Sequence, residues 1–380
     1  MTEKLYYKDA YIAEFNATVI SCEGEGDLYA ITLDRTAFFP EEGGQYSDRG
    51  FLGENRICDV KERDGIIYHY SPAPISVGSV VFGRIDFDER YEKMQCHTAE
   101  HILSGLIHKH HSLDNVGFHL GAEEVTMDIS SPLSWDELME IERLANEAVY
   151  ANVAVTAIYP TVDEAASIEY RSKLDISENL RIVKIGDYDS CACCAPHLRS
   201  TGEIGLISIL DAVKLRGGMR ISIAAGRRAY RIYRMMYENL SEISHALSAP
   251  RLETAVAVKR TLDAYEEKKS ECKAARTLYF EREAELMPEC DGNAIWTYSD
   301  ASIDELRIIA NKATVKVSGI LVLLSGEDGN YKYVISSSRT DLKGEIKNIN
   351  AALGGKGGGS SVMAQGSFSA PLTEIEKYFI

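Results

Sequence analysis

Residues 88–110 read DERYEKMQCHTAEHILSGLIHKH and form a segment with helical spacing. No proline interrupts it, and its apolar residues recur at intervals that place them on one side of a helix. These residues are Met94, Ile102, Leu103, Leu106 and Ile107. His97 and His101 are four residues apart, so an α-helix places both imidazoles on one face, one turn apart. The segment is predicted to be an amphipathic helix that offers two ligands to one metal ion.

A second group of metal-ligand residue types lies further along the chain, where residues 191–197 read CACCAPH. Cys193 and His197 would supply a thiolate and an imidazole from one short loop, a combination suited to zinc. Cys191 and Cys194 lie equally close, so the spacing alone leaves open which thiol faces the ion. The chain has eight cysteines, too few for a disulfide scaffold, and clustered cysteines in a reducing compartment more often bind metal or react. The two segments together predict a zinc site.

The predicted ligand set leaves the role of the metal open. Four protein ligands close the tetrahedral shell of a structural zinc site, whereas a hydrolytic site keeps one position for water or substrate. HTAEH also fits the H-x-x-E-H pattern of inverted zinc proteases, in which Glu100 would be the general base. In that alternative the third ligand is a downstream glutamate, and CACCAPH has no role.

The residue pattern changes along the chain, whose 380 residues are too many for one ordinary domain of about 100–200 residues. Residues 1–87 alternate in short runs punctuated by Gly, Asp and Pro, which is typical of a small β-barrel or sandwich, and we predict a small β-barrel. Residues 88–237 mix helices and strands, which predicts an α+β domain that holds the metal site. Residues 238–290 are rich in Glu, Lys, Ala and Leu, with a break at Pro250, and predict a long helical linker. Residues 291–380 predict a compact α/β domain, so the chain as a whole is predicted to be α+β.

The charge balance disfavours nucleic acid as a partner of the molecule as a whole. Lys and Arg number 41 and Asp and Glu 58, which gives a net charge of −17, so a polyanion requires a local basic patch. Residues 214–234 offer one candidate patch, because they contain seven Lys and Arg residues and no Asp or Glu.

The N-terminal residues MTEKLYYKDA lack the apolar stretch of a signal peptide. No run of about 18 apolar residues occurs in the sequence. We therefore expect a cytoplasmic protein with no membrane partner.

The predicted linker helix leaves the oligomeric state open. Val258, Leu262 and Tyr265 fall near a heptad seam, but Lys269 and Arg276 occupy seam positions, so the coiled-coil signal is weak. Packing of this helix on its own chain and homodimerisation, through the linker helix or the C-terminal domain, are both compatible with the pattern.

Several separated motifs resemble one family. HTAEHILSGL at 97–106, CCAPH at 193–197 and TGEIG at 201–205 resemble the editing domain of alanyl-tRNA synthetase and the free-standing alanyl-tRNA editing proteins of the AlaX type. LDRTAFFPEEGGQYSDRG at 33–50 resembles the N-terminal strand and Gly-rich turn of that family, and GGKGGGSSVMAQG at 354–366 resembles the C-terminal domain of alanyl-tRNA synthetase. The resemblance covers nearly the whole chain and implies the long AlaX form.

The resemblance also implies a ligand set and an activity. The implied zinc ligands are His97, His101, Cys193 and His197, so that the resemblance selects Cys193 among the three neighbouring thiols. The implied reaction is ATP-independent hydrolysis of the ester that joins a wrong amino acid, mainly serine or glycine, to alanine tRNA. Thr36 matches the family position that senses the serine hydroxyl, and Gln45 matches the position proposed to contact substrate near the metal. The C-terminal domain would bind tRNA.

The leading hypothesis is therefore a zinc-dependent trans-editing deacylase that serves translation fidelity. Two rival hypotheses remain, a zinc metalloprotease of the H-x-x-E-H type and a non-catalytic tRNA-binding protein with structural zinc.

Overall fold

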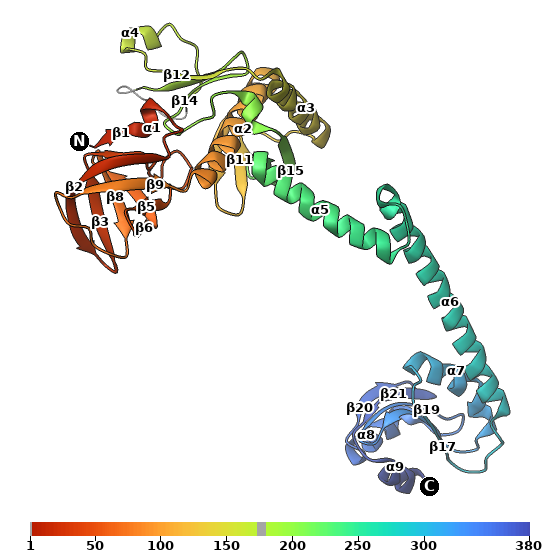
Figure 1. Ribbon diagram of the computed structural model, residues 1–380. Coiled ribbons are helices and arrows are strands. Elements are labelled where there is room, and N and C mark those ends of the chain that lie inside the picture. Colours follow the sequence, from red (N-terminus) through yellow and green to blue (C-terminus); the bar gives the residue numbers. More distant parts are fainter. Residues whose placement is uncertain (1, 173–179) are drawn as a thin grey trace. The chain divides into compact units, whose positions relative to one another are not determined.

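The computed structural model describes residues 2–172 and 180–380, and the chain divides into two compact units, Met1–Ser241 and Glu242–Ile380 (Figure 1). Both units combine helices and strands, so the predicted α+β class is confirmed. The finer division at residues 87, 237 and 290 stays a prediction. Within the described part of the chain, no helix is both long enough and apolar enough to cross a membrane.

The first unit begins with a seven-stranded antiparallel sheet that is nearly closed, as the β-barrel prediction requires. Its strand order is β6-β5-β9-β2-β3-β8-β7, and the end strand β6 also contacts β8 near the opposite end. Along β2, Phe15, Ala17 and Val19 are buried while Glu14 and Asn16 are exposed, so one face of the sheet forms a core. The strands are β2 (Glu14–Glu25), β3 (Leu28–Leu33), β5 (Gly50–Leu52), β6 (Asn55–Ile57), β7 (Asp59–Arg63), β8 (Ile66–Ser71) and β9 (Val80–Ile85). A short parallel pair, β1 (Glu3–Lys4) and β4 (Arg35–Thr36), and helix α1 (Leu5–Lys8) complete this region.

Helix α2 (Phe87–His111) confirms the predicted helix but is not amphipathic over its length. Every residue from Lys93 to Ile107 is buried, because elements pack on several sides of the helix. These elements include the four-stranded sheet β10-β11-β16-β15 and the three-stranded sheet β12-β13-β14. Their bounds are β10 (Asn115–Leu120), β11 (Val125–Ile129), β12 (Val155–Ile158), β13 (Ile182–Ile185), β14 (Asp189–Ala192), β15 (Ile207–Leu215) and β16 (Gly218–Ala225). The helices of this region are α3 (Trp135–Ala151), α4 (Val162–Ala165) and the short 3-10 helix Thr201–Ile204.

A buried ion-pair network centred on Asp48 joins α2 to the N-terminal sheet region. Arg90 Nε donates to Asp48 Oδ2 at 2.8 Å, and Lys93 Nζ lies 3.5 Å from Asp48 Oδ1. Arg90 also donates to the carbonyl oxygens of Ala10 and Ala37. Burial alone would raise the pKa of Asp48, but the two cations hold it below its ordinary value. The carboxylate is therefore ionised and compensates two buried positive charges.

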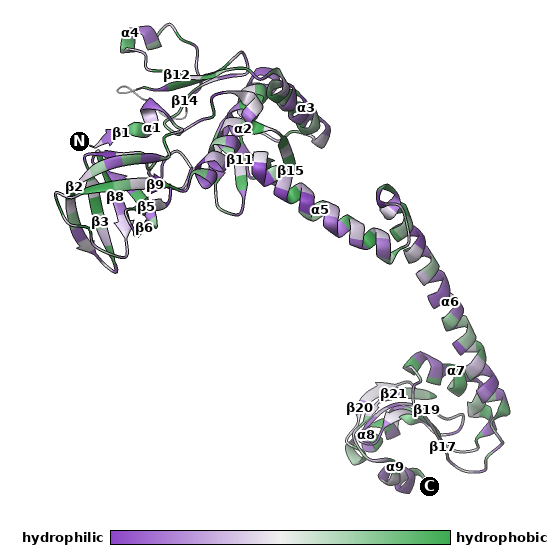
Figure 2. Cartoon of the chain, in the orientation of Figure 1, coloured by the Kyte–Doolittle hydropathy of each residue, from purple (hydrophilic) through white to green (hydrophobic). Residues whose placement is uncertain are grey.

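The second unit contains most of the predicted linker. Helix α5 (Gly226–Ala246) begins in the first unit, earlier than residue 238, and α6 (Thr254–Leu286) follows after a break that contains Pro250, as predicted. Hydrophilic and hydrophobic residues are interspersed along α5 and α6 (Figure 2). Leu262 and Tyr265 are exposed on α6. Homodimerisation through this helix stays a prediction.

A five-stranded sheet with the order β17-β18-β19-β21-β20 forms the rest of the second unit. Its strands are β17 (Ala294–Tyr298), β18 (Leu321–Glu327), β19 (Asn330–Ser336), β20 (Lys356–Gly359) and β21 (Met363–Phe368). The helices are α7 (Ile303–Ala313), α8 (Leu342–Ala352) and α9 (Leu372–Phe379). Leu321 and Leu323 share a hydrophobic cluster with α7, whereas Val322 and Leu324 share one with α8 and α9, so helices cover both faces. The glycine-rich stretch Lys356–Gly359 forms the edge strand β20, because its backbone pairs with β21.

Replacing Asp48 with alanine would leave Arg90 and Lys93 buried without their shared counter-ion. We expect the free energy of unfolding to fall by about 3–5 kcal/mol near neutral pH. Because the folded pKa of Asp48 is lowered, this stabilisation is present above about pH 4, the unfolded value, and is lost as the pH falls further. Urea unfolding of the wild type and the variant from about pH 7 to about pH 3 measures the difference.

The control is Glu140→Ala, which removes an ion pair with Arg143 that is open to solvent. This variant should unfold like the wild type. A D48A variant as stable as E140A near neutral pH would contradict the assigned role of the network.

Candidate metal centre

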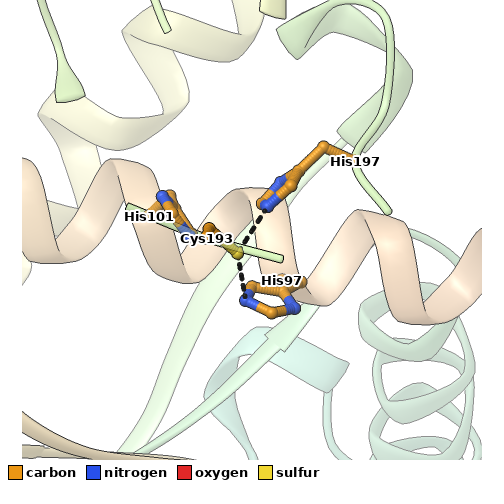
Figure 3. A group of neighbouring side chains, drawn as sticks. All are labelled: His97, His101, Cys193 and His197. Atoms are coloured by element: carbon orange, nitrogen blue, oxygen red, sulfur yellow. Dashed lines mark hydrogen bonds between the residues drawn. The ribbon is translucent and has the colours of Figure 1, made fainter. Parts of the chain in front are cut away.

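His97, His101, Cys193 and His197 lie together, with one ligand atom from each residue within 4.8 Å of the others. The two histidines from α2 project toward the segment that follows β14, which carries Cys193 and His197 (Figure 3). Cys193 Sγ lies 3.6 Å from His97 Nε2 and 3.3 Å from His197 Nε2. All three histidines are buried and Cys193 is partly buried. Two segments that are distant in the sequence thus meet, which the metal-site prediction requires.

The Nδ1 atom of each histidine has a hydrogen-bond partner outside the cluster. His97 Nδ1 lies 3.0 Å from Gln45 Oε1, and His101 Nδ1 lies 2.9 Å from Asp189 Oδ2. His197 Nδ1 lies 3.0 Å from Thr98 Oγ1. In the tautomer in which Nδ1 carries the proton and donates to these oxygens, every Nε2 presents a lone pair to the cluster. This arrangement matches that of histidine ligands around a metal ion.

Asp189 reaches His101 because Gly105 allows close contact between α2 and the hairpin before β14. A Cβ atom on Gly105 would lie 2.2 Å from the carbonyl oxygen of Tyr188 and 2.9 Å from Asp189 Cβ. Gly105 lies one helical turn after His101 on the same face of α2. The hairpin that packs directly over Gly105 therefore also reaches His101. Arg171 Nε donates to Asp189 Oδ1 at 2.8 Å and holds the other carboxylate oxygen.

Arg181 fixes the shape of the segment that carries Cys193. Its Nη1 donates to the carbonyl oxygens of Cys193 and Ala195 at 2.7 and 2.9 Å, respectively. The backbone N–H of Cys193 in turn donates to the Arg181 carbonyl oxygen at 3.0 Å. The thiol is therefore positioned by the residue that precedes β13 as well as by its own loop.

The pKa values at the cluster favour a thiolate at Cys193, a neutral imidazole at His197 and a protonated imidazole at His101. Burial alone would raise the pKa of Cys193, but His97 and His197 hold it well below its ordinary value. Burial lowers the pKa of His197 to about 3, so this imidazole is neutral. Burial also opposes protonation of His101, but the bonds to Asp189 and Cys193 raise its pKa well above the ordinary value. A metal cation would displace the His101 proton and bind the thiolate directly.

The other two thiols of CACCAPH lie outside this group of four. Cys191 is buried and forms a second group with His101 and Asp189, and burial raises its pKa. Cys194 lies 3.5 Å from the position that a Cβ on Gly43 would take, and burial raises its pKa. The structure therefore brings Cys193, rather than either neighbour, among the three imidazoles.

Gln45 and Thr36 have different surroundings. Gln45 is fully buried beside His97, and its Nε2 has no hydrogen-bond partner within residues 2–172 and 180–380. Thr36 is also fully buried, but its hydroxyl pairs with His69 Nε2 at 2.8 Å and accepts the Phe38 N–H at 3.1 Å. Gln45 therefore lies at the cluster, whereas Thr36 bonds to residues outside it.

Glu100, the general base of the protease alternative, is occupied by other partners. Its Oε1 accepts hydrogen bonds from Ser104 Oγ and Asn115 Nδ2. A carboxylate held by two donors is poorly placed to take a proton from water. The protease hypothesis is therefore not favoured.

Most of the basic residues in 214–234 are neutralised by acidic neighbours. Arg228 and Arg231 both pair with Glu92, and Arg227 pairs with Asp88. Arg220 and Arg234 also have carboxylate partners. This segment offers less free positive charge to a polyanion than its sequence suggests.

Thr98, Asp189 and Arg181 position the cluster, although none of them is among the site residues predicted from the sequence. Thr98 directly follows His97 in HTAEH, and Asp189 precedes CACCAPH by two residues, so their proximity to the candidate ligands was the available signal. Arg181 carries no such signal, because its role appears only when β13 lies beside the loop.

Comparisons with known proteins match these features. A family model described as "Threonyl and Alanyl tRNA synthetase second additional domain" matches residues 180–233, which include Cys193 and His197. The chain is 29% identical to the alanyl-tRNA editing protein AlaX-L of Pyrococcus horikoshii, and the match covers 99% of this chain and 96% of that protein. It is 30% identical to an alanine–tRNA ligase of Archaeoglobus fulgidus, with 99% of this chain but only 43% of the ligase covered.

Among solved structures, the C-Ala domain of Aquifex aeolicus alanyl-tRNA synthetase matches 23% of this chain and 86% of that domain. The identity is 21% and the TM-score is 0.21, which is too low to support a structural inference. The sequence comparisons, by contrast, extend along nearly the whole chain. The resemblance predicted from the motifs is therefore confirmed: the protein is similar to the alanyl-tRNA editing proteins of the AlaX type and to the corresponding part of alanyl-tRNA synthetase.

Proposed function

We propose that this chain is a zinc-dependent deacylase that acts in trans on alanine tRNA wrongly charged with serine. The observation that carries the proposal is the buried cluster of three imidazoles and one thiolate, each imidazole bonded at Nδ1 to an outer partner. Similarity to an alanyl-tRNA editing protein over 99% of the chain supports editing as the activity. Hydrolysis adds water across the ester, which releases the free amino acid and the tRNA with its 3′-terminal ribose hydroxyl restored.

The donor set fits zinc, because one thiolate and three neutral imidazoles are ligand types that zinc takes in tetrahedral sites. His97, His101, Cys193 and His197 would hold the ion. When bound, zinc would supply positive charge that polarises an oxygen of the ester or of water. An aminoacyl ester is intrinsically labile, so orientation of the ester and of water accounts for much of what the protein must do.

Gln45 is the residue best placed to orient substrate beside the cluster. Its Oε1 is engaged by His97, while its buried Nε2 has no hydrogen-bond partner among the residues that the structure describes. A buried unpaired donor is unfavourable, so an oxygen atom of the substrate would complete its hydrogen bonding. Gln45 would therefore both hold the His97 tautomer and bind a substrate oxygen.

The remaining alternative is a non-catalytic tRNA-binding protein with structural zinc. A shell of four protein ligands favours that alternative, because it leaves no position for water. The unpaired Gln45 amide favours a substrate site instead, because a purely structural centre has no use for it. Both the deacylase and the non-catalytic binding protein would bind tRNA, and contacts of the tRNA with the second unit are part of both proposals.

The decisive experiment is single-turnover hydrolysis of alanine tRNA charged with serine, glycine or alanine by the full chain loaded with zinc. We expect the serine ester to be hydrolysed and the alanine ester to be spared, because a polar site left unpaired by alanine penalises it. Glycine, like alanine, lacks the serine hydroxyl, so glycine-charged tRNA tests whether the absence of that hydroxyl is enough to protect an ester from hydrolysis. Tight zinc binding without hydrolysis of any of the three esters would favour the binding protein.

Replacing Cys193 with alanine should remove most of the bound zinc and most of the hydrolysis, because a thiolate is the strongest ligand of the set. Metal analysis by mass spectrometry and the serine assay measure the two losses. Cys194→Ala is the matched control and should retain both. Equal zinc content in the C193A and C194A variants would remove Cys193 from the ligand set.

Replacing Asp189 with asparagine should weaken zinc affinity by about 10–100-fold, because His101 loses the carboxylate that fixes its tautomer. Competition with a chromogenic chelator measures the affinity without any substrate. Asp187→Asn, an exposed change in the same hairpin, is the control. A D189N variant with wild-type affinity would show that the bond to His101 does not orient a ligand.

A further inference from the structure

A cavity of about 180 Å³ adjoins the candidate metal centre within the first unit. Its wall comes from residues 6–11, from residues 155–157 of β12, from residues 181 and 183, and from residues 197–199. His197 is shared, because it belongs to the cluster of four and also lines the cavity. A molecule in this cavity would therefore lie directly beside a candidate ligand.

Arg181 is a cation in this wall with unused hydrogen-bonding capacity. Its Nη1 bonds to two carbonyl oxygens of the ligand loop, but its buried Nε has no hydrogen-bond partner in the described parts of the chain. No carboxylate of residues 2–172 or 180–380 forms an ion pair with it, although Arg199 in the same wall pairs with Asp9. A half-buried guanidinium with an unpaired donor favours binding of an anionic oxygen.

Aromatic rings lie beside this cation. The Arg181 guanidinium lies 5.6 Å from the centre of the Tyr7 ring. Tyr159 packs edge-on against Tyr7 with ring centres 6.5 Å apart, and 54% of its surface is exposed. A partly exposed ring and an exposed ring, beside a guanidinium with no carboxylate partner among the described residues, are the combination that binds the bases and phosphates of single-stranded RNA.

We propose that this cavity binds the unpaired 3′-terminal nucleotides of RNA, with a backbone phosphate on Arg181 and a base stacked on Tyr7 and Tyr159. The proposal rests on the proposed function, because it places the RNA end that carries the ester beside His197. It also gives Arg181 two roles, since the side chain that shapes the Cys193 loop also binds the substrate phosphate.

The test variant is Ala157→Glu. Ala157 is an exposed wall residue on β12, an edge strand, and it pairs with the wall residue Val183. Val183 on β13 and Arg181, two residues before it, lie on the same face of the sheet as Ala157, so the new carboxylate faces Arg181 and repels a phosphate. Lys184→Gln is the control, because it changes the net charge equally on an exposed residue outside the cavity wall.

Binding is measured with the full zinc-loaded chain and an uncharged fluorescein-labelled tetranucleotide ACCA, by fluorescence anisotropy. We expect A157E to weaken binding by about tenfold or more and K184Q to bind like the wild type. Tyr159→Ala should weaken binding by about fivefold, the loss of one stacked base. In the deacylation assay, A157E should raise KM more than it lowers kcat, and its zinc content should equal that of the wild type.

Two outcomes overturn the proposal while the proposed function stands. In the first, A157E binds the tetranucleotide as tightly as K184Q, and in the second, the wild type does not bind it although serine-charged tRNA is hydrolysed. If instead binding depends on residue 157 but no ester is hydrolysed, the cavity assignment is supported and the proposed function fails.

Discussion

An imidazole can offer one nitrogen to a metal ion only if its other nitrogen keeps the proton, and at this cluster three imidazoles must do so at once. The three acceptors that meet this requirement come from different parts of the first unit. Gln45 lies between β4 and the barrel strand β5, Thr98 lies on α2 and Asp189 begins β14. The cluster therefore depends on the barrel, the helix and the hairpin being held in one arrangement. Two histidines at helical spacing supply only a small part of what the cluster needs.

Burial of α2 on several sides is what permits this convergence. A helix with one solvent-facing stripe could receive partners from only one side, whereas the buried stretch of α2 contacts strands, a helix and the Cys193 loop. Such burial is tolerable because the polar side chains that face inward are paired, as Arg90 is with Asp48 and Glu100 with Ser104. Gly105 adds the close approach that brings Asp189 to His101. The ion-pair network near the start of α2 and the metal cluster near its middle thus depend on the same packing.

The sequence predicted the parts of this arrangement that are local. Helical spacing placed His97 and His101 on one face, alternation predicted the barrel strands, and Pro250 marked the break between α5 and α6. Features that depend on tertiary contacts were missed for a physical reason. The basic segment 214–234 looked like free charge because Glu92 and Asp88, which neutralise it, lie far away in the sequence. Arg181 was missed because its guanidinium acts on a loop carried by another strand. The prediction that α2 is amphipathic was wrong for the same reason. Its second face is covered by strands that lie outside residues 88–110 in the sequence.

The surroundings of Thr36 constrain how it could distinguish serine from alanine. His69 Nδ1 lies 3.0 Å from the Ile31 carbonyl oxygen and donates to it, and burial lowers the pKa of His69 to about 4, so His69 Nε2 is an acceptor near neutral pH. The Thr36 hydroxyl must then donate to His69, and its oxygen already accepts the Phe38 N–H. One acceptor position remains on that oxygen. A serine hydroxyl could therefore only donate to Thr36, and because Thr36 is fully buried, the residues that cover it would have to move before it could do so. Discrimination at this position would thus depend on two features. The Thr36 oxygen is an acceptor of fixed orientation, and reaching it requires a local displacement of the protein. The serine hydroxyl would gain a hydrogen bond from that displacement, whereas the alanine methyl group would gain none.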